Sequence, residues 1–374
     1  MLTKYKTKDM MKKCHITIGF IFMGLMACKT NNLSYDEALF NQIENGGFNG
    51  NVLVFEKGEI NLKKAFGLAN INNGDSLKIG SIFRLGSVSK QFTAMAVAIL
   101  EEDGVLSYDQ NIQDVIPELP YIGITVEHLL QHTSGLPDYL DLMINHWKPE
   151  LEENDPARYI SGNEDIVQMM IEKTPEIHFE PGQKWEYSNT GYVLLATIVE
   201  RVSGKPFEVF LKERIFEPAG MTNTSVYKFV DGQDPKMPLR VFGFSDENGE
   251  RILNDTHFLN FAKGDGGVYS TLEDLLRWDR ILHTDELVTA ATLERVFTAG
   301  KLNNGEAFEY GFGWFLDNKN PRIKIVYHGG GWVGFGTYIY RDISRDSCFI
   351  ILTNNSSWQE VETLVEKFKI IMAN

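Results

Sequence analysis

The sequence predicts an α+β fold, in which an antiparallel sheet built from both chain ends is flanked by helices and carries an inserted, mostly helical subdomain. Strand-like runs separated by turn residues occur near the start of the chain and again in its last third. The region between them, from about residue 87 to 219, has mainly the apolar periodicity of helices. We therefore expect the sheet part at about residues 36–86 and 300–374, and the helical part at about 87–299.

The N-terminal part begins with a predicted helix at about residues 35–44, which ends at Gly46 and Gly47. Two predicted strands, at 50–55 and 61–67, then flank a hairpin-type turn.

In the middle of the chain, apolar residues at helical spacing predict a helix at 88–102, which stops at Asp103 and Gly104. Another is predicted at 192–202, with Gly204 as its cap and Pro206 at the start of the next helix. The last third is predicted to hold three strands and a closing amphipathic helix, at 323–327, 336–341, 347–352 and 358–372 respectively.

The first residues indicate export. Five lysines precede an apolar run at 16–27, whose 12 residues fall short of the ~20 that a membrane-spanning helix needs. They suit the central region of a signal peptide, here residues 1–27. The run ends in Leu25-Met26-Ala27-Cys28, which resembles the lipobox of bacterial lipoproteins. That resemblance implies a lipid on Cys28, with residues 28–35 as a tether. We expect a protein secreted across the inner membrane, lipid-anchored to a bacterial membrane, and facing the periplasm or the cell exterior.

Charge and cysteine content narrow the classes of partner. Removing the leader takes away five lysines and one aspartate, so the formal net charge falls from -15 to -19. An acidic chain of this kind argues against nucleic-acid binding. With Cys14 in the leader and a lipid on Cys28, Cys348 remains alone, so the mature chain has no intramolecular disulfide. The apolar run around Cys348 indicates a small buried side chain.

Ser87 and Lys90 are the first candidates for catalysis. Ser87 stands where a strand or loop gives way to a helix, a position typical of a capping residue, and Lys90 follows three residues later on the same helical face. A serine hydroxyl needs a nearby base to become a good nucleophile. A lysine at a helix N-terminus feels the positive end of the helix dipole, which favours its neutral form. Taken alone, the same pair describes a capped helix with a solvated lysine.

A second candidate segment is the loop predicted just before the helix at 192–202. It places the phenol of Tyr187 and the amide of Asn189 two residues apart. A lysine ammonium nearby would lower the pKa of Tyr187, which would make it a general base or proton shuttle for Ser87. Asn189 can donate to a substrate carbonyl. The alternative is an aromatic loop that packs on the core, and Trp185 and Tyr192 fit that role.

The third candidate is the glycine-rich stretch from His328 to Gly336. Small residues let a substrate approach the strand closely, so a backbone N–H there can complete an oxyanion hole. Glycines 329, 331 and 334 also match the dinucleotide-binding fingerprint. We reject that interpretation because a strand, and not a helix, is predicted to follow.

Together with the stretches at 124–136 and 264–270, these segments resemble the serine β-lactamase and penicillin-binding-protein superfamily. The likeness is closest to its class C-like branch, which includes family VIII carboxylesterases, D-aminopeptidases and DD-peptidases, and it spans residues 36–374. The resemblance implies that Ser87 is acylated, that Lys90 and Tyr187 manage protons, and that Asn189 orients the substrate amide. It also implies an oxyanion hole made by the N–H groups of Ser87 and Gly331, with no metal or organic cofactor.

One departure from the family pattern bears on the substrate. Many members carry Lys-Thr-Gly where this chain has His328, Gly329 and Gly330. Lysine is a constant cation suited to a substrate carboxylate, whereas histidine is charged only part of the time near neutral pH. We therefore expect a serine hydrolase that acts on peptides containing D-amino acids or on esters outside the cytoplasm, with peptidoglycan fragments among the candidate substrates. The alternatives are a β-lactamase and a catalytically silent sensor or binding protein.

His128 and His132 form a competing signal. Their spacing suits metal ligands on one face of a helix. The glutamate that follows the first histidine in zinc proteases is missing, so we assign no metal.

Overall fold

The computed structural model describes residues 35, 37–147, 161–228, 237–320 and 322–373. The predicted export signal, Cys28 and all of the tether except Tyr35 lie outside the described residues. In the described ranges, no helix is both long enough and apolar enough to cross a membrane.

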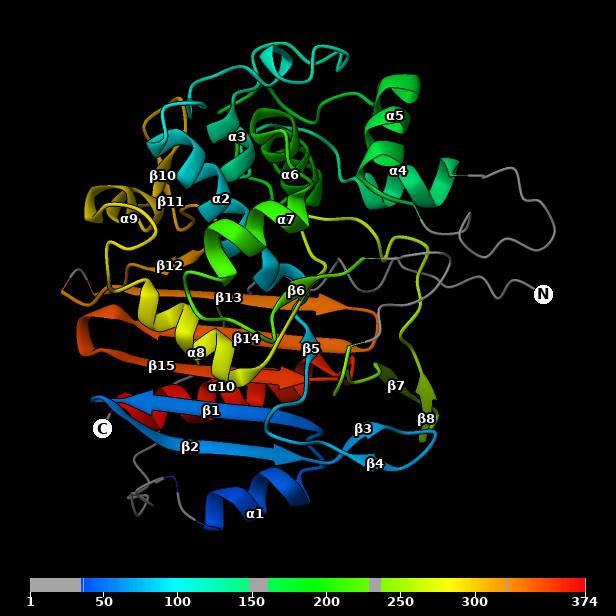
Figure 1. The fold of residues 1–374 in the computed structure, drawn as a ribbon, viewed down its shortest axis with the longest axis vertical. Coiled ribbons are helices and arrows are strands. Elements are labelled where there is room, and N and C mark those ends of the chain that lie inside the picture. The colour runs from blue at the N-terminus through cyan, green and yellow to red at the C-terminus, as the bar shows by residue number, and fades with distance from the viewer. Residues whose placement is uncertain (1–34, 36, 148–160, 229–236, 321, 374) are drawn as a thin grey trace, which may run out of the picture. The chain divides into compact units, whose positions relative to one another are not determined.

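A six-stranded sheet in the order β12-β13-β14-β15-β1-β2 forms the base of the fold, and each neighbouring pair is antiparallel (Figure 1). Strand β1 from the start of the chain pairs with β15 from its end, with Val52 opposite Ile351. Both chain ends therefore build the sheet, which confirms the predicted α+β class. The strands are β1 (Gly50–Glu56), β2 (Glu59–Phe66), β12 (Phe315–Asp317), β13 (Ile325–Trp332), β14 (Phe335–Asp342) and β15 (Ser347–Thr353).

Helices cover the sheet on both faces. Strand β15 is buried along its whole length, including Cys348, as expected for a strand that is covered on two sides. Helix α8 (Leu272–Ile281) packs on β15 and β1, while α10 (Trp358–Ala373) packs on β14 and β15. In Figure 1, α8 lies in front of the sheet and α10 behind it, and α1 (Glu37–Asn45) lies beside β2.

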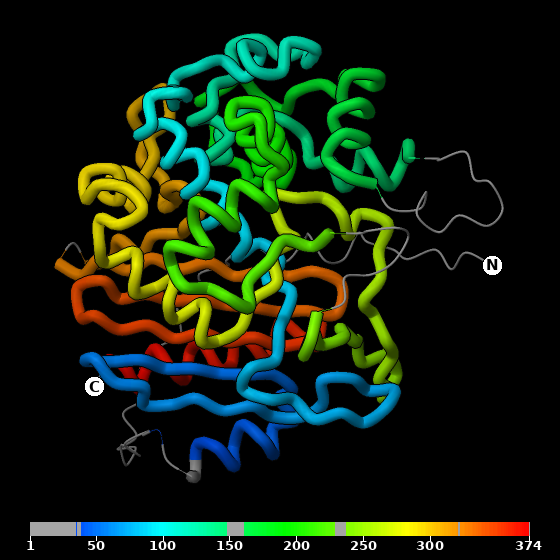
Figure 2. Tube along the Cα trace, in the orientation of Figure 1, coloured from blue at the N-terminus to red at the C-terminus, as the bar shows by residue number. Residues whose placement is uncertain are grey.

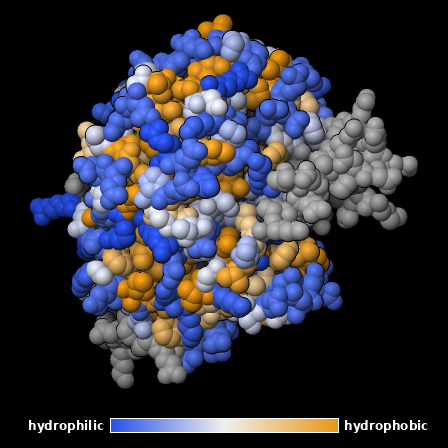
Figure 3. Space-filling model, in the orientation of Figure 1, coloured by the Kyte–Doolittle hydropathy of each residue, from blue (hydrophilic) through white to orange (hydrophobic). Residues whose placement is uncertain are grey.

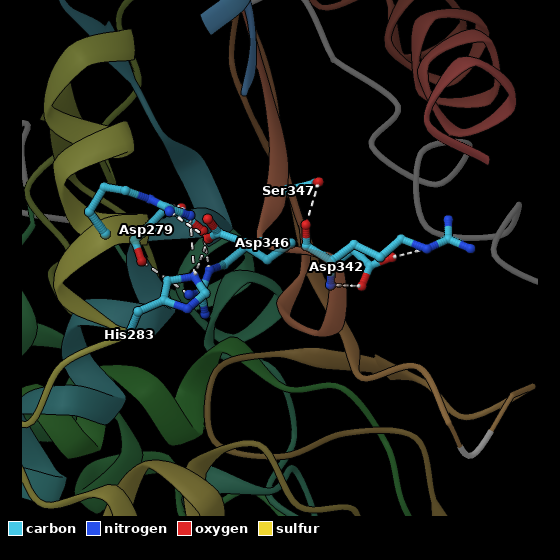
Figure 4. Close-up of polar contacts among 8 residues, drawn as sticks. Asp279, His283, Asp342, Asp346 and Ser347 are labelled. Carbon is cyan, nitrogen blue, oxygen red and sulfur yellow. Dashed lines mark hydrogen bonds and ion pairs between the residues drawn. The ribbon is translucent and has the colours of Figure 1, made fainter. Parts of the chain in front are cut away.

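An ion-pair network joins α8 to the sheet. Arg341 of β14 donates from Nε and Nη2 to Asp279 of α8, and both side chains are fully buried. Figure 4 shows Asp279 on α8, and His283 just after the helix, facing Asp346, which precedes β15. Arg280 bridges Asp279 and Asp346. Helix α8 lies within the range predicted for the helical part, yet it covers the sheet.

The middle of the chain forms the helical layer, which runs from cyan through green to the yellow of α9 in Figure 2, whereas strands from the start and the end of the chain lie together in the sheet. Its centre is α2, where every residue from Lys90 to Leu100 is buried, as expected of a helix surrounded by others. Helix α2 packs on α6, α7 and α9. The helices of this layer are α2 (Lys90–Glu102), α3 (Val126–Leu130), α4 (Tyr139–His146), α5 (Asn163–Lys173), α6 (Asn189–Ser203), α7 (Phe207–Leu211) and α9 (Ala290–Val296).

Two features differ from the predicted elements. The strand expected at 323–327 continues to Trp332, because Gly331 still pairs with Gly336 on β14. Several short strands were not predicted. They are β3 (Leu68–Asn70), β4 (Asp75–Ser76), β5 (Phe83–Arg84), β6 (Ser225–Val226), β7 (Phe244–Glu247), β8 (Glu250–Leu253), β9 (Val268–Ser270), β10 (Gly300–Lys301) and β11 (Ala307–Phe308). One small sheet, in the order β5-β9-β6, leads the chain into the Ser87 turn.

The face of the molecule seen in Figure 3 mixes hydrophobic with hydrophilic residues.

Candidate active site

Ser87 lies in a 3₁₀ turn, Gly86–Ser89, between β5 and α2. Its neighbours Gly86 and Val88 are buried, whereas Ser87 is partly exposed, so Ser87 is the accessible residue of this turn. The expectation that Ser87 caps the helix is wrong. Ser89 holds the capping position of α2 and makes no side-chain cap bond; its hydroxyl instead accepts from the backbone N–H of Val268.

Lys90 is fully buried beside the serine. Its Nζ lies 3.2 Å from Ser87 Oγ, 2.8 Å from Asn189 Oδ1 and 2.9 Å from the carbonyl oxygen of Asp265. Burial lowers the pKa of Lys90 to about 8, although the negative charges of Asp265 and Asp138 oppose the shift. The sequence predicted the direction of this shift from the helix dipole, but burial is its main cause.

The sequence indicated that Asn189 lies in the loop before a helix. In the structure, Asn189 is instead the first residue of helix α6. Its backbone N–H and its Nδ2 both donate to Asp138 Oδ2, at 3.1 and 2.9 Å. The other oxygen of Asp138 accepts from Leu140 N at 3.0 Å and so caps α4. The side chain of Asn189 is therefore held between Asp138 and Lys90.

Tyr187 differs from expectation in its ionisation. Burial raises its pKa well above the usual value, and a hydrogen bond with Ser87 opposes this rise only in part. The predicted lowering by lysine is wrong because burial dominates the pKa of Tyr187, even though Lys90 Nζ lies 4.9 Å from the centre of the tyrosine ring. Tyr187 is thus a neutral phenol at pH 7, with an O–H that can donate.

Histidine and aromatic rings hold Tyr187 in place. The ring of His132 packs at 4.3 Å from that of Tyr187, and His132 Nδ1 accepts from the N–H of Ser188. Burial lowers the pKa of His132 well below its usual value, so the ring is neutral. His128 contributes elsewhere, since it exchanges two hydrogen bonds with Thr125 at the start of α3.

The glycine-rich strand β13 lies directly against the Ser87 turn. Gly86 has φ +53°, and a Cβ there would lie 2.9 Å from the backbone nitrogen of Gly331. A Cβ on Gly330 would lie 3.0 Å from the nitrogen of Ser87 and 2.1 Å from the Leu85 carbonyl. Both positions therefore require glycine for this close approach. The approach places the Gly331 nitrogen beside the residue before Ser87, and Gly331 itself is exposed.

His328 lies on this strand and is buried, at 1% exposure. Its Nε2 lies 3.1 Å from the hydroxyl of Tyr310 and its Nδ1 lies 2.6 Å from the carbonyl oxygen of Gly329. Burial and then the charge of Lys90 lower its pKa to about 3. The ring is therefore neutral at pH 7, and the expectation of a charge that switches near neutral pH is wrong.

Sequence reasoning missed four residues that build this site: Asp138, Asp265, His132 and Tyr310. Asp138 had a detectable signal, because an aspartate directly before a helix is a typical capping residue. Asp265 and His132 lie in the stretches that carried the family resemblance, but the resemblance of a whole stretch did not assign a role to either residue. Tyr310 showed no signal, since only the fold brings it to His328.

Comparisons with known proteins identify related families and folds. The family profile described as Beta-lactamase matches residues 37–367. A penicillin-binding protein of Bacillus subtilis (strain 168) is 38% identical over 350 residues, which cover 91% of this chain and 75% of the relative. The D-aminopeptidase of Gluconobacter oxydans (strain 621H) is 24% identical, over 84% of this chain and 57% of its own length.

Solved structures share the fold. The penicillin-binding protein from Bacillus halodurans superposes with a TM-score of 0.76 at 24% identity, and the match covers 89% of this chain and 99% of that one. The D-amino acid amidase from Ochrobactrum anthropi SV3 gives a TM-score of 0.69 at 23% identity, with the same coverage of 89% and 99%.

Proposed function

The chain belongs to the beta-lactamase family, and from that premise we propose that it is a serine hydrolase that forms an acyl-enzyme at Ser87. The observation that carries the proposal is the contact between the fully buried Lys90 amine and Ser87 Oγ, at 3.2 Å. With a pKa of about 8, Lys90 has an appreciable neutral fraction near pH 7 and can accept the serine proton.

In the acylation step, Ser87 Oγ attacks the substrate carbonyl carbon and its proton passes to Lys90 Nζ. The carbonyl oxygen becomes an oxyanion, which the N–H groups of Ser87 and Gly331 stabilise. The bond to the leaving group then breaks, and the leaving amine or alkoxide takes a proton from Lys90, relayed by the Tyr187 hydroxyl. Water attacks the acyl carbon in the second half of the reaction, and Ser87 regains its proton.

The proposed substrates are peptides containing D-amino acids, or esters. Two similar proteins, one in sequence and one in fold, bear the names D-aminopeptidase and D-amino acid amidase. The neutral ring of His328 occupies the position where many relatives carry lysine, so a substrate carboxylate gains little there. We therefore favour these substrates over β-lactams, which carry a carboxylate.

The test is covalent labelling with a fluorophosphonate and with a labelled penicillin, followed by mass mapping of the adduct. We expect the fluorophosphonate adduct on Ser87 and its loss in Ser87→Ala. Ser89→Ala is the matched control, because Ser89 lies two residues away and its hydroxyl is committed to Val268. D- and L-aminoacyl p-nitroanilides then give the stereochemical preference. Labelling that survives Ser87→Ala, or that maps to Ser89, would overturn the proposal.

We also propose that the protein is exported and anchored by a lipid on Cys28, which the leader sequence supports. The membrane fraction of wild type and Cys28→Ser measures this. We expect the variant to leave the membrane or to keep its leader. A mature N-terminus away from Cys28, without lipid, would contradict the anchor.

A further inference from the structure

The three partners of Lys90 restrict how its neutral amine can be oriented. A neutral amine has two N–H bonds and one lone pair. Asn189 Oδ1 and the Asp265 carbonyl oxygen, at 2.8 and 2.9 Å, can only accept hydrogen bonds. They therefore take both N–H bonds, and the lone pair is left for the third neighbour, Ser87 Oγ. This is the orientation that a base acting on Ser87 requires.

That orientation depends on which end of the Asn189 amide faces Lys90. If the amide were turned over, its NH₂ would face the amine, and the amine would have to use its lone pair there. Asp138 prevents this, because a carboxylate accepts hydrogen bonds and its Oδ2 binds both the Nδ2 and the backbone N–H of Asn189. The capping bond from Leu140 N to the other oxygen fixes the carboxylate itself.

We propose that Asp138 is a positioning residue: it sets the direction of the Asn189 amide and thereby aims the Lys90 lone pair at Ser87. The inference rests on the proposed function of Lys90 as the base. Asp138 contacts neither Ser87 nor the reacting atoms in this scheme, so it orients the Lys90 lone pair only through Asn189, although its charge also acts on the pKa of Lys90.

The groups that face Lys90 determine how a change at Asp138 appears in a pH profile. Asp265 and Asp138 contribute negative charge. The rings of Tyr187 and Tyr192 lie 4.9 and 5.5 Å from Nζ, and the two nearby histidines, 132 and 328, are neutral at pH 7. Removing the charge of Asp138 therefore leaves Asp265 as the remaining negative group and lowers the pKa of Lys90.

The experiment measures kcat, KM and the pH profile of Asp138→Asn on a p-nitrophenyl ester. We expect kcat to fall about tenfold to a hundredfold, the range typical of a misdirected catalytic group, with KM little changed. The rising limb of kcat/KM should move to lower pH. Asp141→Asn is the matched control, because Asp141 is an exposed acid in the first turn of the same helix. The proposal would be overturned if Asp138→Asn kept the wild-type kcat and the wild-type pH profile of kcat/KM. It would also be overturned if Asp141→Asn changed both quantities by the same amounts as Asp138→Asn.

A swapped pair provides a second measurement. In the double variant Asp138→Asn with Asn189→Asp, the amide at 138 donates to the carboxylate at 189, whose other oxygen still accepts from Lys90. We expect the double variant to be more active than Asp138→Asn at high pH. The rising limb of its kcat/KM profile should lie at higher pH than in the wild type, because a carboxylate now contacts Lys90 and raises its pKa.

If Asp138→Asn does not fold, the swapped pair is compared with Asn189→Asp alone, and equal activity of those two rejects the proposal. Failure of the proposed function is distinguishable, since it would appear as turnover that survives Ser87→Ala.

Discussion

Two buried cations of this protein show opposite uses of charge. Lys90 in the site and Arg341 in the sheet are both fully buried. Arg341 donates to the carboxylate of Asp279, which Figure 4 labels, and that carboxylate also binds Arg280. Lys90 instead contacts a hydroxyl, an amide oxygen and a backbone carbonyl, which are all uncharged.

The ionisation of each group follows from its partners. Burial would raise the pKa of Asp279, but Arg341 and Arg280 outweigh it and hold that pKa below its usual range. For Lys90, burial prevails over the more distant carboxylates and lowers the pKa to about 8. Asp279, which is paired directly with buried Arg341, therefore stays charged and stabilises the fold. Lys90, whose direct contacts are neutral, loses its proton more easily.

The largest expected effect is on catalysis, in Lys90→Met. Removing the proton acceptor should lower kcat/KM about 10²–10⁴-fold, the usual contribution of general base catalysis. Lys63→Met, which removes a lysine from an exposed ion pair with Glu273, serves as the control and should keep wild-type kinetics. Steady-state kinetics on one ester measures both variants. Near-normal turnover in Lys90→Met would mean that this buried amine is merely structural.

The next effect is on stability, in Asp279→Asn. The substitution leaves Arg341 buried without a carboxylate, which costs about 3–5 kcal/mol of unfolding free energy. Asp346→Asn, at the half-exposed end of the same network, should cost at most about 1 kcal/mol. Urea denaturation checks both values, and kcat per folded molecule should not change in either. Equal costs would show that burial of this pair adds nothing.

A third prediction concerns how stability changes with pH. The folded pKa of Lys90 is about 8, below the usual lysine value of 10.5, so the unfolded chain holds this proton more tightly. Burying the protonated Lys90 therefore lowers the free energy of unfolding. This destabilisation has its full size below pH 8 and disappears as the pH rises towards 10.5, a change of about 3 kcal/mol. The wild type should therefore gain stability relative to Lys90→Met across that window, as measured by denaturation at a series of pH values. Parallel curves for the two proteins would contradict the lowered pKa.

The sequence predicted the parts of the fold that rest on local pattern. The helix at 88–102 and the strand at 347–352 have apolar spacing that short-range physics determines, and both were found within two residues of the expected bounds. The strand through His328 was cut short, because a run of glycines has no strand pattern of its own. Its length is set by pairing with β14, which is a tertiary effect.

Part of the candidate site was predictable from the sequence, but four of its residues and the ionisation of two others were not. Motif order brought Ser87, Lys90 and Asn189 together, and the structure places them in contact. The ionisation of Tyr187 and His328 could not be read from sequence, because it depends mainly on how deeply the fold buries each ring. Asp138 was missed for a similar reason, since its contact with Asn189 spans 51 positions in the sequence.

The smallest expected effect comes from adding a second cation to the site, in His328→Lys. A lysine here has the hydroxyl of Tyr310 within reach, and among the described residues the hydrogen-bond partners of His328 are this hydroxyl and the Gly329 carbonyl, so this lysine resembles Lys90 more than Arg341. We expect the ratio of kcat/KM for carboxylate-bearing β-lactams to that for p-nitrophenyl esters to rise by less than about tenfold, or roughly 1 kcal/mol. The rising limb of the pH profile should also move to lower pH, because like charges repel and lower the pKa of Lys90.

His328→Gln keeps a neutral group that can bond to Tyr310, so it should change neither quantity. An unchanged ratio in His328→Lys would make His328 a packing residue, and efficient wild-type turnover of β-lactams with negligible ester or peptide cleavage would reverse the proposed substrate preference.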